Sequence, residues 1–317
     1  MQRKCPACGA LAMRGWRLAT ASDPQLAGRR SYELERCEAC GSAATVDAGD
    51  HSGALYEGGT YSTERRAFAP LLEPLRRLAE RDRLRFVAAV PHGARVLEVG
   101  AGDGRFVALL ASAGFDAHGI EPSPSACEAA ARIGAAVANA SAETAAVEAR
   151  TEDAVVIWHA LEHTDDPRAT VALAREWLVP GGRLIVAVPD LASLQARIGG
   201  DRWFHQDVPR HRTHFTRAGL VSLLERTGLR VVRVRHLLVE QNPLGMWQTL
   251  LNRLTGERDF AFRLIKRDLD GVARPAIARD LLITAIAGPL LVAVAPALEL
   301  GAGLAGRGGS MVVEAIR

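Results

Sequence analysis

Short apolar runs alternate with helical stretches from residue 94 to residue 235. Each apolar run has the length of a β-strand: Arg95–Val99, Ala117–Glu121, Ala136–Asn139, Ala154–Trp158, Arg183–Val188 and Leu229–Arg235. Runs with helical character lie between several of them: Arg105–Ala113, Ser125–Ile133 and Arg168–Trp177. Apolar strands separated by helices are typical of parallel sheets with right-handed crossovers. The pattern therefore predicts an α/β fold with a doubly wound sheet.

The first fifty residues carry two Cys-x-x-Cys motifs. Four of the five cysteines form these pairs, Cys5 with Cys8 and Cys37 with Cys40, and a glycine follows each pair. Thiolates at this spacing hold one side of a tetrahedral Zn²⁺, so two pairs complete its ligand shell. Residues 1–50 are therefore predicted to form a zinc-ribbon-like module, with redox or unpaired cysteines as the alternative. Such a module either binds a partner or nucleic acid, or braces the next domain.

Residues 51–92 are predicted to be a helical linker between this module and the α/β region. A loop with two tyrosines, Tyr56 and Tyr61, precedes Leu71, Leu75 and Leu78 at helical spacing. The segment is either a connecting helix packed on the next domain or a lid over an active site.

Composition and charge narrow the class of protein. The 317 residues are 48% hydrophobic and 24% charged, which is an ordinary globular composition. The net charge is +3, from 39 basic and 36 acidic residues, too balanced for a dedicated nucleic-acid binder. The first residues have no apolar stretch of a secretory signal, so a cytoplasmic, reducing compartment is expected.

A glycine-rich loop follows the first strand of the α/β region. It reads Glu98-Val-Gly-Ala-Gly-Asp-Gly104, and a helix is expected to begin at once. Glycines let the backbone turn sharply and approach a ligand closely, beside the amides of a helix N-terminus. The second strand ends at Glu121, where a carboxylate can accept hydrogen bonds from both hydroxyls of a ribose. The third strand ends near Ser141 and Ala142, where an adenine edge would lie in this topology.

The loop and Glu121 resemble motif I and the ribose-binding acid of the class I S-adenosylmethionine-dependent methyltransferases. Two further segments also resemble that family: Trp158–Pro167 and Leu178-Val-Pro-Gly-Gly-Arg-Leu184. The resemblance covers residues 93–235 and implies a seven-stranded Rossmann-like methyltransferase sheet. In that family the last two strands form an antiparallel pair, so Met311–Ile316 would be the final strand, within residues 309–317. Residues 236–308 would then be a helical insertion before it.

The resemblance also implies which residues bind S-adenosylmethionine. Gly100 and Gly102 would shape the pocket for its methionine part, Glu121 would hold the ribose, and Ser141 or Ala142 would face the adenine amino group. Glu98 would either order the loop or contact the ligand. Many relatives carry an acidic residue where this chain has Ser141. The full implied set is Glu98, Gly100, Gly102, Gly104, Glu121, Pro122, Ser141, Ala142, Trp158 and His159, the last two near the sulfonium.

Two clusters of polar residues are expected where loops leave the carboxyl edge of the sheet. One is His159 with His163, and the other is Asp207 with His211 and His214. Methyl transfer is an in-line displacement, and a hydroxyl acceptor benefits from a general base such as histidine. Each cluster is therefore either catalytic or a structural part of its loop. A second metal site formed by these histidines is a further alternative, although their spacing is not the tight spacing of metal ligands. The fourth strand is not followed by an Asn-Pro-Pro-Tyr or Asp-Pro-Pro-Tyr motif. The lack of this motif favours an oxygen acceptor over a nitrogen acceptor.

The expected insertion contains an uncharged apolar run, Leu281–Leu298. A helix over this run would be about 27 Å long, marginal for crossing a bilayer core. Pro289 and Pro296 are expected to break it. Three readings remain open: a broken helix pair dipping into one leaflet, a buried helical subdomain or homo-oligomer interface, and a membrane span. Basic residues surround the run and suit an anionic membrane surface: Arg263, Lys266, Arg267, Arg274, Arg279 and Arg307.

The sequence thus predicts a cytoplasmic enzyme, peripheral to the inner face of the membrane if the apolar run meets lipid. The expected acceptor is a small or lipid-linked molecule, such as a glycolipid, a polyprenyl-linked sugar or a quinone precursor. An RNA methyltransferase that uses its zinc module for RNA is the alternative enzyme, although the charge balance argues against nucleic acid. The alternative outside enzymes is a binding module that kept the fold and lost the chemistry.

Overall fold

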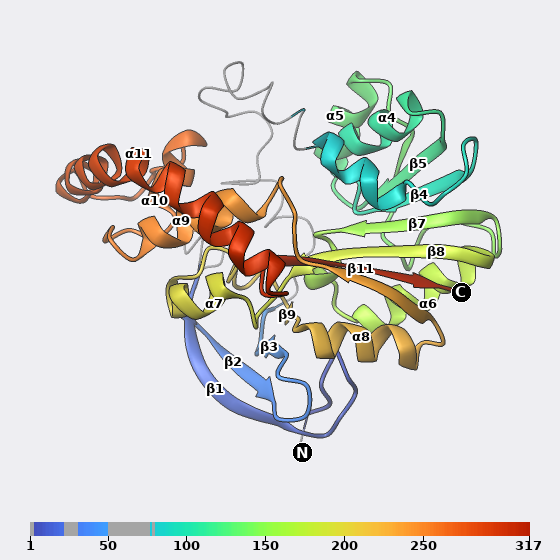
Figure 1. Ribbon diagram of the computed structural model, residues 1–317, viewed down its shortest axis with the longest axis horizontal. Helices are drawn as coiled ribbons and strands as arrows, with labels where there is room; N and C mark the ends of the chain where they lie inside the picture. Colours follow the sequence, from blue (N-terminus) through green and yellow to red (C-terminus); the bar gives the residue numbers. More distant parts are fainter. Residues whose placement is uncertain (1–2, 22–30, 50–76, 78–79) are drawn as a thin grey trace.

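The computed structural model describes residues 3–21, 31–49, 77 and 80–317 (Figure 1). Its larger sheet has seven strands in the order β10-β11-β8-β7-β4-β5-β6. Only β11 runs against its neighbours in this sheet; the registers of the other strand pairs are parallel. The predicted doubly wound sheet is therefore confirmed. The strands are β4 (Arg95–Val99), β5 (Asp116–Glu121), β6 (Val137–Asn139), β7 (Glu152–Trp158), β8 (Leu178–Pro189), β10 (Arg230–Arg235) and β11 (Ser310–Ile316).

Helices cover both faces of this sheet. Val155 and Ile157 of β7 share a core with α6 and α8, whereas Val156 and Trp158 share a second core with α4. Burial on both faces explains why the strands read as continuous apolar runs. Ser123 begins its helix in the ordinary way, because its side chain accepts a hydrogen bond from the amide of Ala126. The helices around the sheet are α4 (Arg105–Ser112), α5 (Pro124–Arg132), α6 (Pro167–Trp177), α7 (Leu194–Gly199) and α8 (Arg217–Arg226).

The N-terminal residues form a second, four-stranded antiparallel sheet. It contains β1 (Met13–Thr20), β2 (Ser31–Cys37), β3 (Ala43–Thr45) and β9 (Thr213–His214), in that order. Strand β9 comes from the loop between β8 and β10 of the larger sheet, and His214 pairs with Ala43. The sequence predicted the N-terminal module without this fourth strand. The cysteine module and the loop that carries His211 are therefore parts of one sheet.

Most of the predicted linker, residues 51–76 and 78–79, lies outside the described residues. A helix over residues 80–87 precedes β4, and Phe86 and Val87 pack into the core beside β7. This helix therefore packs on the larger sheet.

Three helices lie between β10 and β11: α9 (Asn242–Asn252), α10 (Phe260–Ile265) and α11 (Arg274–Leu304). Pro289 and Pro296 both lie inside α11, so the expected break at these residues is wrong. Each proline removes one helical hydrogen bond, but its neighbours are mainly alanine, leucine and valine, and α9 packs alongside. Trp247 of α9 donates a hydrogen bond of 2.9 Å to the carbonyl of Gly288, beside the first proline.

The C-terminal part of α11 is fixed to the larger sheet by a buried carboxylate. Glu299 is 3% exposed, and one of its oxygens accepts a hydrogen bond of 2.8 Å from Gln195. The other oxygen accepts a hydrogen bond of 2.6 Å from the amide of Gly309, directly before β11. Between Leu281 and Leu298, α11 is apolar and most of its large side chains are solvent-exposed.

Candidate active site

The glycine loop connects β4 to α4 in a left-handed conformation. Gly100, Gly102 and Gly104 have φ angles of 75°, 53° and 74°. The amide of Gly100 donates a hydrogen bond of 2.9 Å to the carbonyl of Ile120 in β5, which fixes the start of the turn. A β-carbon at residue 100 would lie 2.5 Å from the β-carbon of Ala160. Backbone conformation and close packing both require glycine there.

Glu121 at the end of β5 braces this loop. One carboxylate oxygen accepts a hydrogen bond of 2.9 Å from the amide of Gly102, and the other accepts one of 2.9 Å from the amide of Ser123. Burial raises the pKa of Glu121, while these two amides act in the opposite direction. The carboxylate therefore lies beside the glycine loop, at the carboxyl edge of the sheet. Pro122 follows it, and its carbonyl accepts a hydrogen bond from Asn139.

Glu98 at the end of β4 does not have the loop-ordering contacts that Glu121 has. Its side chain is buried, with one oxygen 3.9 Å from a guanidinium nitrogen of Arg83. Its other oxygen has no hydrogen-bond partner among the described residues. Burial raises the pKa of Glu98 to about 8. Ligand contact by Glu98 stays a prediction.

Ser141 and Ala142 follow β6, next to the edge where Glu121 lies. The Ser141 amide donates a hydrogen bond of 2.9 Å to the hydroxyl of Thr144, and its carbonyl accepts one of 3.0 Å from Ala145. Ala142 is buried. The two residues begin a tight turn at the end of the third parallel strand, where the sequence placed them.

Trp158, the last residue of β7, and His159, directly after it, each have a buried ring nitrogen. Trp158 Nε1 and His159 Nε2 have no hydrogen-bond partner among the described residues. His159 has a φ of 50°, an uncommon conformation for a residue with a side chain, and such strain clusters at functional sites. Its Nδ1 lies 3.2 Å from a carboxylate oxygen of Glu162. Burial lowers the pKa of His159 to about 4, so its imidazole is neutral near pH 7.

His163 and His211 are brought together, while His214 lies in the N-terminal sheet. The rings of His163 and His211 have centroids 4.7 Å apart. His214 is buried in β9, and its Nε2 lies 3.1 Å from the hydroxyl of Thr45. Asp207 accepts a hydrogen bond of 2.8 Å from the guanidinium of Arg210. The two predicted clusters therefore meet through His163 and His211.

Sequence reasoning did not single out Arg83 and Glu162, two charged residues at this edge of the sheet. Arg83, from the helix over residues 80–87, forms a two-pronged ion pair with Glu240, two residues before α9. The guanidinium of Arg83 lies 5.0 Å from the ring centroid of Trp158. Arg83 is one of several arginines in its segment, and nothing in the spacing distinguishes it. Glu162, in contrast, stands inside the motif that carried the family resemblance.

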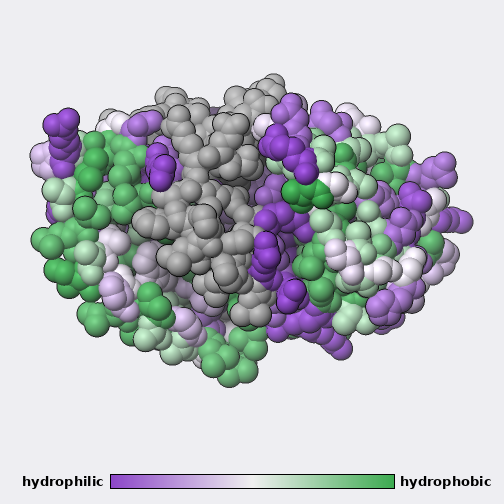
Figure 2. Space-filling model, turned by 90° about the horizontal axis from the view of Figure 1, so that it is seen from above, coloured by the Kyte–Doolittle hydropathy of each residue, from purple (hydrophilic) through white to green (hydrophobic). Residues whose placement is uncertain are grey.

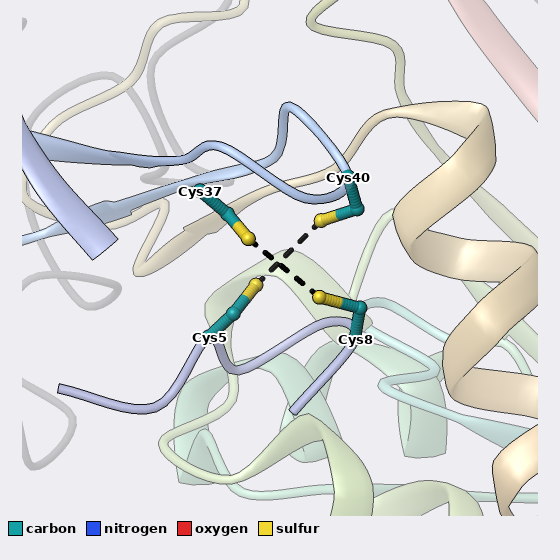
Figure 3. Close-up of side chains that lie close together, drawn as sticks. All are labelled: Cys5, Cys8, Cys37 and Cys40. Atoms are coloured by element: carbon teal, nitrogen blue, oxygen red, sulfur yellow. Dashed lines mark hydrogen bonds between the residues drawn. The ribbon is translucent and has the colours of Figure 1, made fainter. Parts of the chain in front are cut away.

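The four N-terminal cysteines converge on one point (Figure 3). The sulfurs of Cys5 and Cys40 are 3.7 Å apart, and those of Cys8 and Cys37 are 3.6 Å apart. All four sulfurs lie within 4.8 Å of one another. Tetrahedral zinc–sulfur bonds of about 2.3 Å place sulfurs about 3.8 Å apart. The cluster therefore has the size of a four-thiolate metal site.

Comparisons with known proteins agree with this geometry. The chain is 28% identical to a ubiquinone biosynthesis O-methyltransferase of Xanthomonas axonopodis pv. citri over 174 residues, which are 50% of this chain and 72% of that protein. It is 34% identical to an uncharacterised protein of Mycobacterium bovis over 146 residues, 44% of this chain and 48% of that one. A crystal structure of an S-adenosylmethionine-dependent methyltransferase from Archaeoglobus fulgidus shares the fold, with a TM-score of 0.50, 18% identity, and coverage of 79% of this chain and 98% of that chain.

A family model described as a methyltransferase domain matches residues 71–234, more than half of the chain. The matched region contains the glycine loop, Glu121 and the strained turn at His159. By this match, the chain belongs to the methyltransferase-domain family, and it is an S-adenosylmethionine-dependent methyltransferase.

Proposed function

We propose that this enzyme methylates a hydroxyl oxygen of a lipid-linked or similarly hydrophobic acceptor at the cytoplasmic face of a membrane. The observation that carries this proposal is the exposed apolar surface of α11, which is continuous in sequence with the final strand of the catalytic sheet. The name of the Xanthomonas relative, an O-methyltransferase of ubiquinone biosynthesis, supports the same class of reaction.

The residues at the carboxyl edge of the sheet fit S-adenosylmethionine. Gly100 and Gly102 would admit its methionine part, and the remaining lone pairs of Glu121 would accept its ribose hydroxyls. Ser141 and Ala142 would lie beside the adenine. The buried, unsatisfied atoms of Glu98, Trp158 and His159 are groups that a bound ligand would satisfy. Bound there, S-adenosylmethionine supplies the electrophilic methyl group.

His159 is the residue best placed to take the proton of the acceptor hydroxyl. Its Nδ1 faces the carboxylate of Glu162, so the lone pair of the neutral ring is on Nε2. A hydroxyl beside Nε2 would transfer its proton there while its oxygen forms the new bond to the methyl carbon, and the bond from that carbon to the sulfonium sulfur would break with its electron pair going to sulfur. Glu162 would stabilise the resulting imidazolium, and the rest of the rate enhancement would come from alignment.

Replacing Glu121 by alanine is expected to weaken S-adenosylmethionine binding by about 1–3 kcal/mol, because the ribose loses its acceptor and two backbone amides lose theirs. Calorimetry measures this dissociation constant directly. Glu128→Ala removes an exposed carboxylate from α5 and should leave the affinity unchanged. Equal affinities for both variants would remove Glu121 from the ribose site.

The apolar surface of α11 supports the membrane part of the proposal. Among the described residues, α11 is the helix long and apolar enough to cross a membrane, yet only 11% of its most apolar window is buried. Leu282, Ile286 and Leu290 are 62%, 63% and 70% exposed. Figure 2 shows hydrophobic residues gathered at the end of the molecule where α11 lies in Figure 1. Exposed surface of this kind, with arginines at its start, suits insertion into one leaflet of an anionic membrane.

Co-sedimentation with anionic liposomes tests this contact. The intact protein should sediment with the vesicles, and a variant with Leu282, Ile286 and Leu290 changed to glutamine should stay in solution. Leu18→Gln, at a residue 66% exposed in β1, removes exposed apolar surface elsewhere and should sediment normally. If the intact protein and the triple variant behave alike, α11 is not a membrane contact, and soluble acceptors become the better proposal.

We also propose that the ion held by Cys5, Cys8, Cys37 and Cys40 is a structural Zn²⁺. Four thiolates leave no open position for substrate, so the ion would stabilise the N-terminal sheet and would not take part in methyl transfer.

A further inference from the structure

Three side chains near the proposed acceptor side form a second compact group of metal-binding atoms. Glu162 and His163 lie in the short helix η2 (Leu161–His163) after β7, and His211 lies in the loop before β9. One potential ligand atom from each residue lies within 4.8 Å of the other two. Glu162 is 1% exposed and His211 is 6% exposed, so water does not freely surround the group.

Backbone carbonyls fix both histidines in the same tautomer. Nδ1 of His163 lies 3.1 Å from the carbonyl oxygen of Arg210, and Nδ1 of His211 lies 2.9 Å from that of His205. A carbonyl oxygen only accepts, so Nδ1 carries the proton in each ring and Nε2 carries the lone pair. Metal-binding histidines are commonly oriented in this way, with the other ring nitrogen donating to a carbonyl or carboxylate.

The carboxylate of Glu162 supplies the observation that points to a ligand. One of its oxygens lies 3.2 Å from His159 Nδ1, whereas the other is buried without a hydrogen-bond partner among the described residues. A buried carboxylate oxygen without a partner is costly, and a bound cation would remove that cost. The buried guanidinium of Arg210, next to His211 in sequence, is paired with Asp207 at 2.8 Å, so its positive charge is compensated.

We propose that Glu162, His163 and His211 bind a divalent transition-metal ion of the zinc type, distinct from the ion of the four cysteines. Two imidazoles and one carboxylate suit zinc and its neighbours better than magnesium or calcium. Three protein ligands leave a position open for water or for an oxygen of the acceptor. The site adjoins His159, because a carboxylate oxygen of Glu162 lies 3.2 Å from its Nδ1. The metal site itself does not depend on the identity of the acceptor or on membrane binding.

Metal analysis of the full chain tests the proposal. The protein is stripped with a chelator, reconstituted with Co²⁺ or Zn²⁺, dialysed and analysed for bound metal. Intact protein should hold two ions per chain. Glu162→Gln and His211→Ala should each hold one, while the thiolate-to-cobalt absorption of the cysteine site persists. His214→Gln changes the neighbouring histidine that bonds to Thr45 and should still hold two ions.

S-adenosylmethionine binding by calorimetry, measured on every variant, reports folding separately from metal content. Glu162→Gln keeps the size of the side chain, so it serves as the readout if His211→Ala does not fold. One ion per chain in the intact protein, or two in a folded Glu162→Gln variant, would overturn the proposal. Either result leaves the proposed methyl transfer standing, because methyl transfer is measured separately with the cofactor.

Discussion

Replacing Cys37 by serine is expected to release the metal of the N-terminal sheet and to destabilise the protein by at least about 4 kcal/mol. The four sulfurs have the spacing of a tetrahedral site, and a three-thiolate remnant would hold the ion far less tightly. The effect should extend beyond the module. Thr45 donates a hydrogen bond of 2.7 Å to the carbonyl of His211, and Thr216 donates one of 2.6 Å to the carbonyl of Cys40.

Hydrogen exchange measures how far the loosening extends. Amides of residues 31–45 and of residues 203–216 should lose protection together, while those of β4, β7 and β8 keep it until global unfolding. Cys127→Ser is the matched control, because Cys127 lies in α5 and outside the cluster. Unchanged metal content in Cys37→Ser would contradict the four-cysteine site, and unchanged protection of residues 203–216 would contradict the coupling.

The alternation of strands and helices was predictable because it depends on local patterns. The central strands β4, β7 and β8 are mostly buried, so their sequences are largely apolar and stand out from the helices around them. The positions of Gly100, Gly102 and Glu121 followed for the same reason, since the ends of parallel strands must meet at one edge of the sheet. The Cys-x-x-Cys pairs were recognisable because zinc sites require that spacing.

The parts that could not be predicted depend on contacts between distant segments. Strand β9 has only two residues, and it forms because Ala43 and Ala44 offer an edge that no local pattern reveals. His211 is far from Glu162 and His163 in sequence, so no local spacing predicted that the three side chains lie together. The continuity of α11 through Pro289 depends on packing against α9, which local helix preferences do not include.

Replacing Gly100 by alanine is expected to weaken S-adenosylmethionine binding about tenfold or more. The left-handed conformation alone costs a residue with a β-carbon about 1–2 kcal/mol of stability. The new methyl group would also lie 2.5 Å from the β-carbon of Ala160, so the glycine loop and the turn after His159 must separate. Forced separation of this kind typically costs about 1–3 kcal/mol, and it displaces both walls of the proposed cofactor site.

Two further variants separate the clash from the backbone strain. Gly134→Ala introduces a β-carbon at a φ of 73° with no atom within 4 Å, so it should lower stability while leaving cofactor affinity unchanged. Ala160→Gly, combined with Gly100→Ala, removes the atom that the new methyl group meets and should restore most of the lost affinity. The recovered binding free energy would measure the coupling energy between these two contacting residues. If the double variant binds as weakly as Gly100→Ala, backbone strain in the loop, and not its contact with the turn after His159, controls cofactor binding.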